Sequence, residues 1–207
     1  MFETGEWKLS EYEVEGSKIY VIDNFYKDPD FVYNYSIDPL PNPWKHNPHM
    51  GYNMDRYEDR RRVDQNNNLV DIYGRLSAIC GQPPEYDNQF VTNVTKFYDR
   101  AYNNFERKYW WPHKDLGYNG IVYLNNLDSH PGTNLYSVDS LNPLLPEWMC
   151  PWVSRDDYNL IHTIESKYNR LVLFDGHKFH HGMAIEDDRY FYQYRVNQVY
   201  FFYGAHL

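Results

Sequence analysis

The chain carries short runs of apolar residues, many of them alternating with polar ones, from residue 89 onward. Such runs are typical of half-buried strands, and we expect strands at 90–98, 109–113, 120–124, 133–136, 170–174, 179–185 and 190–203. Glycine, proline, asparagine and aspartate separate the runs, as expected of turns. A series of short strands without helical patterns between them predicts a sandwich or barrel rather than a parallel α/β sheet.

The first third of the chain has a mixed pattern. The run 18–22 predicts a strand. Asp28-Pro29-Asp30 is typical of a helix start, because a capping residue precedes a proline suited to the first helical position. We expect the apolar members of this helix to face the core, namely Phe31, Val32 and Tyr35.

Helical spacing returns at 69–79, where a second helix is predicted to end before Gly81. The proline-rich segment 38–53 is expected to be a loop. Residues 137–167 form a longer insert in which we expect a short helix near 155–164. Long segments on a rigid scaffold often form lids or substrate walls.

The composition narrows the classes of function. The 207 residues carry a formal net charge of −9, which argues against broad binding to nucleic-acid backbones, because that affinity comes from basic side chains that neutralise phosphates. The basic strip 56–62 is interleaved with acidic residues and is expected to be a solvated face. We expect no export signal and no membrane span. The spacing of Cys80 and Cys150 fits a reducing, cytoplasmic location.

One pair of residues carries candidate chemistry. His113 and Asp115 are two residues apart, so in an extended strand both side chains point to the same face and can reach one metal ion. A second imidazole could come from the later stretch that holds His177, His180 and His181. Two histidines and one carboxylate, with the remaining positions open, are the ligand set of non-haem Fe(II) oxygenases.

An ordered set of motifs surrounds this pair. It comprises Trp111-Pro112-His113-Lys114-Asp115, Tyr118-Asn119-Gly120-Ile121-Val122-Tyr123-Leu124-Asn125, Pro131-Gly132-Thr133-Asn134-Leu135-Tyr136, Asn169-Arg170-Leu171-Val172-Leu173-Phe174 and Phe179-His180-His181-Gly182. The set resembles the 2-oxoglutarate/Fe(II) dioxygenases, and within them the prolyl-4-hydroxylase-like branch with its small bacterial and viral relatives. The resemblance covers most of the chain and depends on the order of the motifs, because no single motif is specific.

The resemblance implies a mainly β fold with supporting α-helices, a double-stranded β-helix or cupin-like jelly roll. It implies a single oxygenase domain over residues 1–207. Residues 1–88 would form a mixed α/β support region, and residues 89–207 would form the jelly-roll core.

The family also implies a metal-ligand set. Iron(II) would be held by His113, Asp115 and a distal histidine that follows a strand of the Arg-Leu-Val-Leu-Phe type. That position points to His180. His181 would face away in a regular strand, and His177 lies in the turn, so they remain the second and third choices.

The co-substrate 2-oxoglutarate needs a cation for its far carboxylate, and an arginine fork with two parallel hydrogen bonds suits that role. Arg195 opens a strand that matches the last strand of the small relatives, and it would point inward. The spacing from His180 to Arg189 is closer to the one usual in the family, but Arg189 stands beside acidic residues at a turn. We favour Arg195 over Arg189. Tyr98 and Tyr123 match positions where family members place a tyrosine hydroxyl near the co-substrate.

The implied activity is hydroxylation of a C–H bond with O₂, coupled to decarboxylation of 2-oxoglutarate to succinate. The substrate stays open between a peptidyl residue, such as proline, and a small molecule. A cupin-type metalloenzyme that does not use 2-oxoglutarate and a non-catalytic jelly-roll binding protein are the alternatives. A zinc hydrolase shares the ligand types but lacks an evident general base.

Overall fold

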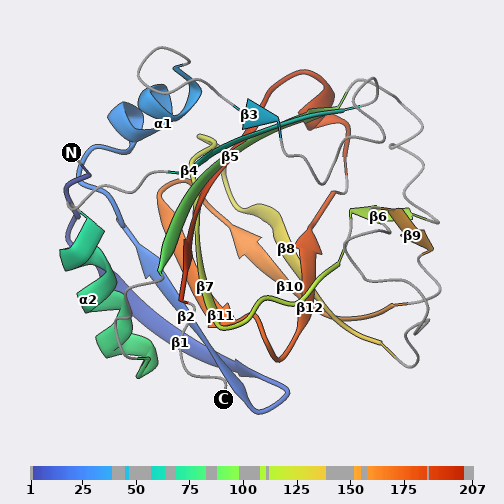
Figure 1. Cartoon of the computed structure of the whole chain (residues 1–207), viewed down its shortest axis with the longest axis horizontal. Helices are drawn as coiled ribbons and strands as arrows, with labels where there is room; N and C mark the ends of the chain where they lie inside the picture. Colours follow the sequence, from blue (N-terminus) through green and yellow to red (C-terminus); the bar gives the residue numbers. More distant parts are fainter. Residues whose placement is uncertain are drawn as a thin grey trace.

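Strand pairing builds two main antiparallel sheets in the part of the chain that the structure describes (Figure 1). The larger has eight strands, in the order β1 (Lys8–Val14), β2 (Ser17–Asp23), β11 (Arg170–Asp175), β7 (Tyr118–Tyr123), β13 (Arg195–Phe201), β5 (Gln89–Phe97), β4 (Tyr57–Val63) and β3 (Lys45–His46). The smaller has three, in the order β10 (Asn159–Ser166), β8 (His130–Ser137) and β12 (His180–Met183). A separate pair joins β6 (Lys108–Trp110) to β9 (Trp152–Ser154).

The structure is a computed structural model that describes residues 2–38, 45–46, 57–63, 69–82, 88–97, 108–110, 112–138, 152–154, 158–185 and 187–202. Along the chain, the later strands move back and forth between the two main sheets. Strand β7 is in the large sheet, β8 and β10 are in the small one, and β11, β12 and β13 then alternate. This antiparallel order is that of a double-stranded β-helix, or jelly roll, so the fold class predicted from the sequence is confirmed.

Side-chain alternation divides the core into two layers. Val172 and Phe174 of β11 pack between the two sheets, whereas Leu171 and Leu173 pack on the opposite face of the large sheet. The inner layer consists of Val14, Ile19, Ile121, Tyr123, Leu135, Ile164, Val172, Phe174, Phe179 and Val199. Because both faces of β11 are covered, its sequence is continuously apolar rather than alternating.

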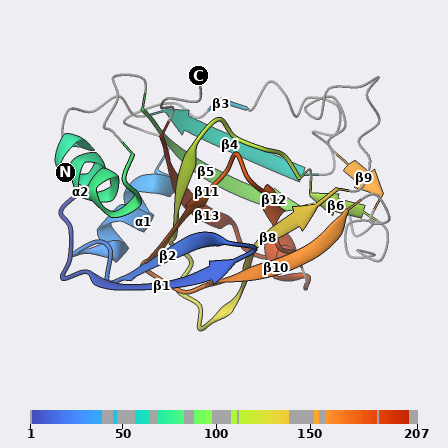
Figure 2. The same ribbon diagram turned by 90° about the horizontal axis from the view of Figure 1, so that it is seen from below.

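Two α-helices among the described residues, α1 (Pro29–Ile37) and α2 (Val70–Cys80), lie beyond the outer face of the large sheet, away from the small sheet (Figures 1 and 2). Helix α1 begins as predicted, because the Asp28 side chain accepts a hydrogen bond from the Phe31 backbone N–H at 2.9 Å. Val32 is buried, but the expectation for Phe31 is wrong, because its side chain is 46% exposed. Helix α2 ends at Gly81, whose φ of 73° is left-handed.

Three further differences concern strands. The expected helix near 155–164 is wrong, because Ile161, Thr163 and Ile164 belong to β10, and β-branched side chains suit a strand. Strand β1 was not expected, and it adds an outer edge to the large sheet beside β2. The last strand begins at Arg195 rather than at 190, after the 3₁₀ helix η6 (Arg189–Phe191).

Two other expectations concern segments that the structure describes only in part. The basic strip contributes to β4, which pairs with β5 inside the large sheet. The loop predicted at 38–53 lies largely outside the described residues, with β3 inside it. No helix of the described ranges is long and apolar enough to cross a membrane.

A buried polar network joins α1 to the outer face of the large sheet. The Tyr26 hydroxyl donates to Gln198 Oε1 at 2.6 Å and lies 2.6 Å from the Tyr200 hydroxyl. Gln198 Nε2 in turn donates to the hydroxyls of Ser36 and Thr92, both at 3.3 Å. Burial raises the pKa of Tyr26, so its hydroxyl keeps the proton that this network requires.

We expect Tyr26→Phe to lower the free energy of unfolding by about 1–3 kcal/mol, because it leaves Gln198 Oε1 buried without its donor. Denaturant unfolding followed by circular dichroism measures the change. Tyr192→Phe is the matched control, since Tyr192 is 65% exposed, and we expect a change of less than about 0.5 kcal/mol. Equal effects of the two substitutions would contradict a structural role for the network.

Candidate metal centre

The segment that contains His113 and Asp115 is held by backbone hydrogen bonds on two sides. His113 and His181 exchange two of them, N to O at 3.0 Å and 2.9 Å, and form an isolated antiparallel bridge. The Asp115 N–H donates to Gly176 O at 3.0 Å, and the Gly176 N–H donates to Gly117 O at 3.0 Å. The segment is thereby fixed against both ends of the turn between β11 and β12.

That turn is itself shaped by Asp175. Its Oδ1 accepts hydrogen bonds from the backbone N–H groups of His177 and Lys178, at 2.9 Å and 3.2 Å. An aspartate that accepts from N–H groups further along the chain stabilises a tight turn. The sequence Asp-Gly-His-Lys therefore places the start of β12 beside His113.

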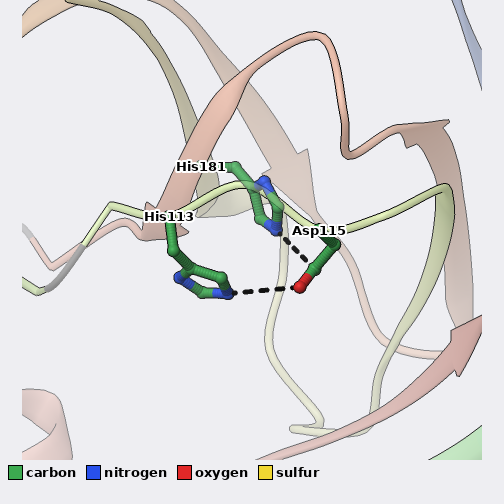
Figure 3. A group of neighbouring side chains, drawn as sticks. All are labelled: His113, Asp115 and His181. Carbon is green, nitrogen blue, oxygen red and sulfur yellow. Dashed lines mark hydrogen bonds and ion pairs between the residues drawn. The ribbon is translucent and has the colours of Figure 1, made fainter. Parts of the chain in front are cut away.

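The side chains of His113, Asp115 and His181 point toward one another (Figure 3). His181 Nε2 lies 3.1 Å from Asp115 Oδ2, and His113 Nε2 lies 3.9 Å from Asp115 Oδ1. One ligand atom from each residue lies within 4.8 Å of the others. The predicted pair of His113 and Asp115 is thus brought together with one later histidine.

That histidine is His181, and the structure does not bring His180, the histidine preferred from the sequence, to His113 and Asp115. Neighbouring residues of a strand face opposite ways. The imidazole of His180 packs edge-on against Tyr158, with ring centroids 5.8 Å apart, on the other face of β12. Phe179 and Met183, two residues to either side of His181, are also buried. His177 is exposed in the turn and lies outside the cluster.

Both ring nitrogens of His181 face oxygen atoms. Nδ1 lies 3.2 Å from the carbonyl oxygen of Phe179, which suits an Nδ1–H donor. Nε2 faces the Asp115 carboxylate. The contact between this nitrogen and the carboxylate oxygen is attractive only when a proton or a metal ion lies between them. Metal-binding histidines characteristically donate their other N–H to a backbone carbonyl or a carboxylate. His181 is therefore oriented as a ligand.

Asp115 is ionised at neutral pH. Burial by itself would raise its pKa, but the hydrogen bond and charge of His181, the charge of His113 and a hydrogen bond from Asn119 hold the pKa well below its usual range. Asn119 Nδ2 donates to Asp115 Oδ2 and lies 3.1 Å from His181 Nε2. Asn119 was not among the predicted site residues, although the alternation Asn119, Ile121, Tyr123 along β7 indicates that it faces inward.

The three residues fit a metal ion. Bonds of about 2.1 Å place neighbouring donors of an octahedron about 3 Å apart. His181 Nε2 and Asp115 Oδ2 are already 3.1 Å apart, and His113 Nε2 and Asp115 Oδ1 are 3.9 Å apart. The three ligand atoms lie within 4.8 Å of one another, so the side chains would have to draw together to bind one ion. Two imidazoles and one carboxylate on one side of the ion suit Fe(II), with the other coordination positions left for small molecules.

A buried cation lies further along the same barrel interior. Arg195 of β13 is 7% exposed. Its Nη1 donates to Asn197 Oδ1 at 2.9 Å, and its Nη2 donates to Gly132 O at 3.3 Å. No carboxylate of the described residues forms an ion pair with it. An anionic group that entered this interior could pair with the guanidinium through charge-assisted hydrogen bonds.

The other predicted co-substrate residues differ in their placement. The Tyr123 hydroxyl lies 2.7 Å from Thr133 Oγ1, and burial raises the pKa of Tyr123 to about 12. Arg189 lies in η6, where its guanidinium is paired with Asp187, with Nη2 to Oδ2 at 2.5 Å. Tyr98 lies outside the described residues. Of the two arginines, the geometry therefore favours Arg195 as the inward-facing cation.

No protein-family model and no curated protein sequence matches this chain. Among solved structures, it is similar to the crystal structure of a prolyl-4-hydroxylase from Pseudomonas putida, with a TM-score of 0.46 and 11% sequence identity. The alignment covers 96% of this chain and 93% of that chain. A likeness at this level assigns neither an activity nor any residue.

We expect His181→Ala to weaken the binding of Fe(II) or Co(II) by at least about 100-fold, since it removes one of three ligands, a larger loss than that of a supporting residue. His180→Ala is the matched control, and we expect it to bind metal as the unaltered chain does. Isothermal titration under anaerobic conditions measures both. The reverse order of the two variants would contradict the assignment of His181.

Proposed function

We propose that this chain is an Fe(II)- and 2-oxoglutarate-dependent oxygenase that hydroxylates a C–H bond of a peptidyl residue or a small molecule. One observation carries the proposal. The barrel interior holds both a cluster of two histidines and one carboxylate and, further along, a buried arginine. Among the described residues, no carboxylate pairs with this arginine.

The separation of the two sites suits a short dicarboxylic acid. Arg195 reaches the carbonyl of Gly132, and His181 pairs with Leu135 on the same strand, β8. Three residues of strand span about 10 Å. A molecule that chelates the ion at one end can therefore present its far carboxylate to Arg195.

The charges support a doubly negative co-substrate. A divalent ion and Arg195 bring three positive charges into the interior, and Asp115 supplies one negative charge. A dicarboxylate supplies the remaining two, so that the loaded site is neutral. Neutrality matters because a net charge is costly to bury in an apolar interior.

Each residue then has a defined task. His113, Asp115 and His181 would hold iron, which together with 2-oxoglutarate supplies the activation of O₂. Arg195 would bind the far carboxylate, and Asn197 would fix the guanidinium. The inner apolar layer excludes water. In the overall reaction, one oxygen atom enters the substrate as hydroxyl and the other enters succinate, with release of CO₂.

Anaerobic titration with Fe(II) and then 2-oxoglutarate tests this proposal. We expect a weak visible band on the order of 500 nm, as open iron sites with this ligand set give when an oxo acid chelates the metal. Arg195→Met should raise the 2-oxoglutarate concentration needed by about 10- to 100-fold, because hydrogen bonds to charged groups contribute about 1.5–3 kcal/mol. Arg189→Met is the matched control and should behave like the unaltered chain.

Other outcomes would favour the alternatives. Iron binding without the band would favour a cupin-type metalloenzyme that does not use 2-oxoglutarate. Binding of neither would leave a non-catalytic jelly-roll protein as the better account. If Arg189→Met rather than Arg195→Met lost the band, the assignment of the interior cation would be wrong.

A further inference from the structure

Asn119 is the polar residue most closely engaged with the three-residue cluster. It lies on β7, is 1% exposed, and its Nδ2 donates to Asp115 Oδ2. The same nitrogen lies 3.1 Å from His181 Nε2. One amide nitrogen therefore contacts two of the three candidate ligands.

The other end of this amide has no comparable contact. Asn119 Oδ1 is buried and has no hydrogen-bond partner among the described residues. Buried polar atoms without partners are uncommon and call for an explanation. Turning the amide by 180° would bring an oxygen against the Asp115 carboxylate, which is repulsive. The hydrogen bond from Asn119 Nδ2 to Asp115 therefore sets the orientation of the amide, and Oδ1 does not contribute to it.

Gly176 leaves room for this arrangement. A Cβ atom at Gly176 would lie 2.7 Å from Asn119 Nδ2 and 2.8 Å from Gly117 O, closer than real Cβ contacts. Gly176 is also the residue whose carbonyl accepts from the Asp115 N–H. The turn that positions Asp115 thus needs a residue without a side chain, so that the Asn119 amide can reach the carboxylate.

We propose that Asn119 is a positioning residue that restricts Asp115 to binding the metal through a single oxygen. The inference rests on the proposed metal site. Oδ2 accepts the amide hydrogen bond and also faces His181 Nε2, whereas Oδ1 faces His113 Nε2. The amide thus occupies Oδ2 and leaves Oδ1 for the ion. With two imidazoles and one carboxylate oxygen, three of six octahedral positions remain open. A chelating oxo acid would need two of these positions and O₂ the third, so a second carboxylate oxygen from Asp115 would block one of them.

The test uses Mn(II), which reports its bound water without turnover. Broadening of its electron paramagnetic resonance lines in ¹⁷O-enriched water gives the number of bound water molecules. We expect three in the unaltered chain and two in Asn119→Leu, which keeps a side chain branched at the same carbon but removes the donor. We also expect Mn(II) affinity to fall by about 10- to 100-fold, as is usual when a residue that supports a ligand is lost.

Two further variants complete the design. Gly176→Ala keeps Asn119 but displaces its amide, so it should also lower the water number, and it covers the case in which Asn119→Leu does not fold. Asn134→Leu is the matched control, because Asn134 is a buried asparagine that hydrogen-bonds Tyr136 and Thr163 instead. It should bind three water molecules.

The outcomes separate this inference from the proposed function. Three water molecules and full affinity in both Asn119→Leu and Gly176→Ala would overturn the role of Asn119 while leaving the metal site intact. Failure of the unaltered chain to bind Mn(II), with Fe(II) also unbound, would overturn the metal site and this inference with it.

Discussion

The pair of backbone hydrogen bonds between His113 and His181 is the constraint on which the rest of the site depends. These bonds join a segment that precedes β7 to the start of strand β12, two parts of the chain that are far apart in sequence. Because the link uses backbone groups, it sets the separation of the two imidazoles before any ion binds. The backbone hydrogen bond from the Asp115 N–H to Gly176 O holds Asp115 in the same way. A site built on such links is preorganised, and its ligands need only small movements to bind.

The interior of the barrel is also polarised. A carboxylate with a lowered pKa lies at one end, and the buried guanidinium of Arg195 lies further along. Ile121, Val172 and Val199 are paired across β7, β11 and β13 and make part of this interior apolar. In a medium of low dielectric these charges act strongly, and a ligand that is anionic at both ends but carries a metal-chelating group at only one would be oriented by them. With the proposed metal ion bound, such an interior would select for the direction as well as the charge of its ligand.

The sequence was sufficient for the fold class, because alternation and turn residues are local signals. It was also sufficient to pair His113 with Asp115, since two residues at i and i+2 share one face of a strand. It did not indicate which later histidine joins this pair, because the family pattern favoured His180, whereas the alternation of Phe179, His181 and Met183 along β12 brings His181 there. The role of Asn119 could not be predicted, because it depends on the turn at Gly176, which tertiary contacts place beside β7. The helix expected near 155–164 failed for a related reason, since pairing with β8 decided that segment.

The central claim is that iron and 2-oxoglutarate share this interior, and crystals loaded anaerobically with both test it most directly. Anomalous diffraction at the iron edge locates the ion independently of any assumption about ligands. We predict one iron peak about 2.1 Å from His113 Nε2, Asp115 Oδ1 and His181 Nε2, with a carboxylate against Arg195. An iron peak at His180, or 2-oxoglutarate bound away from Arg195, would contradict it.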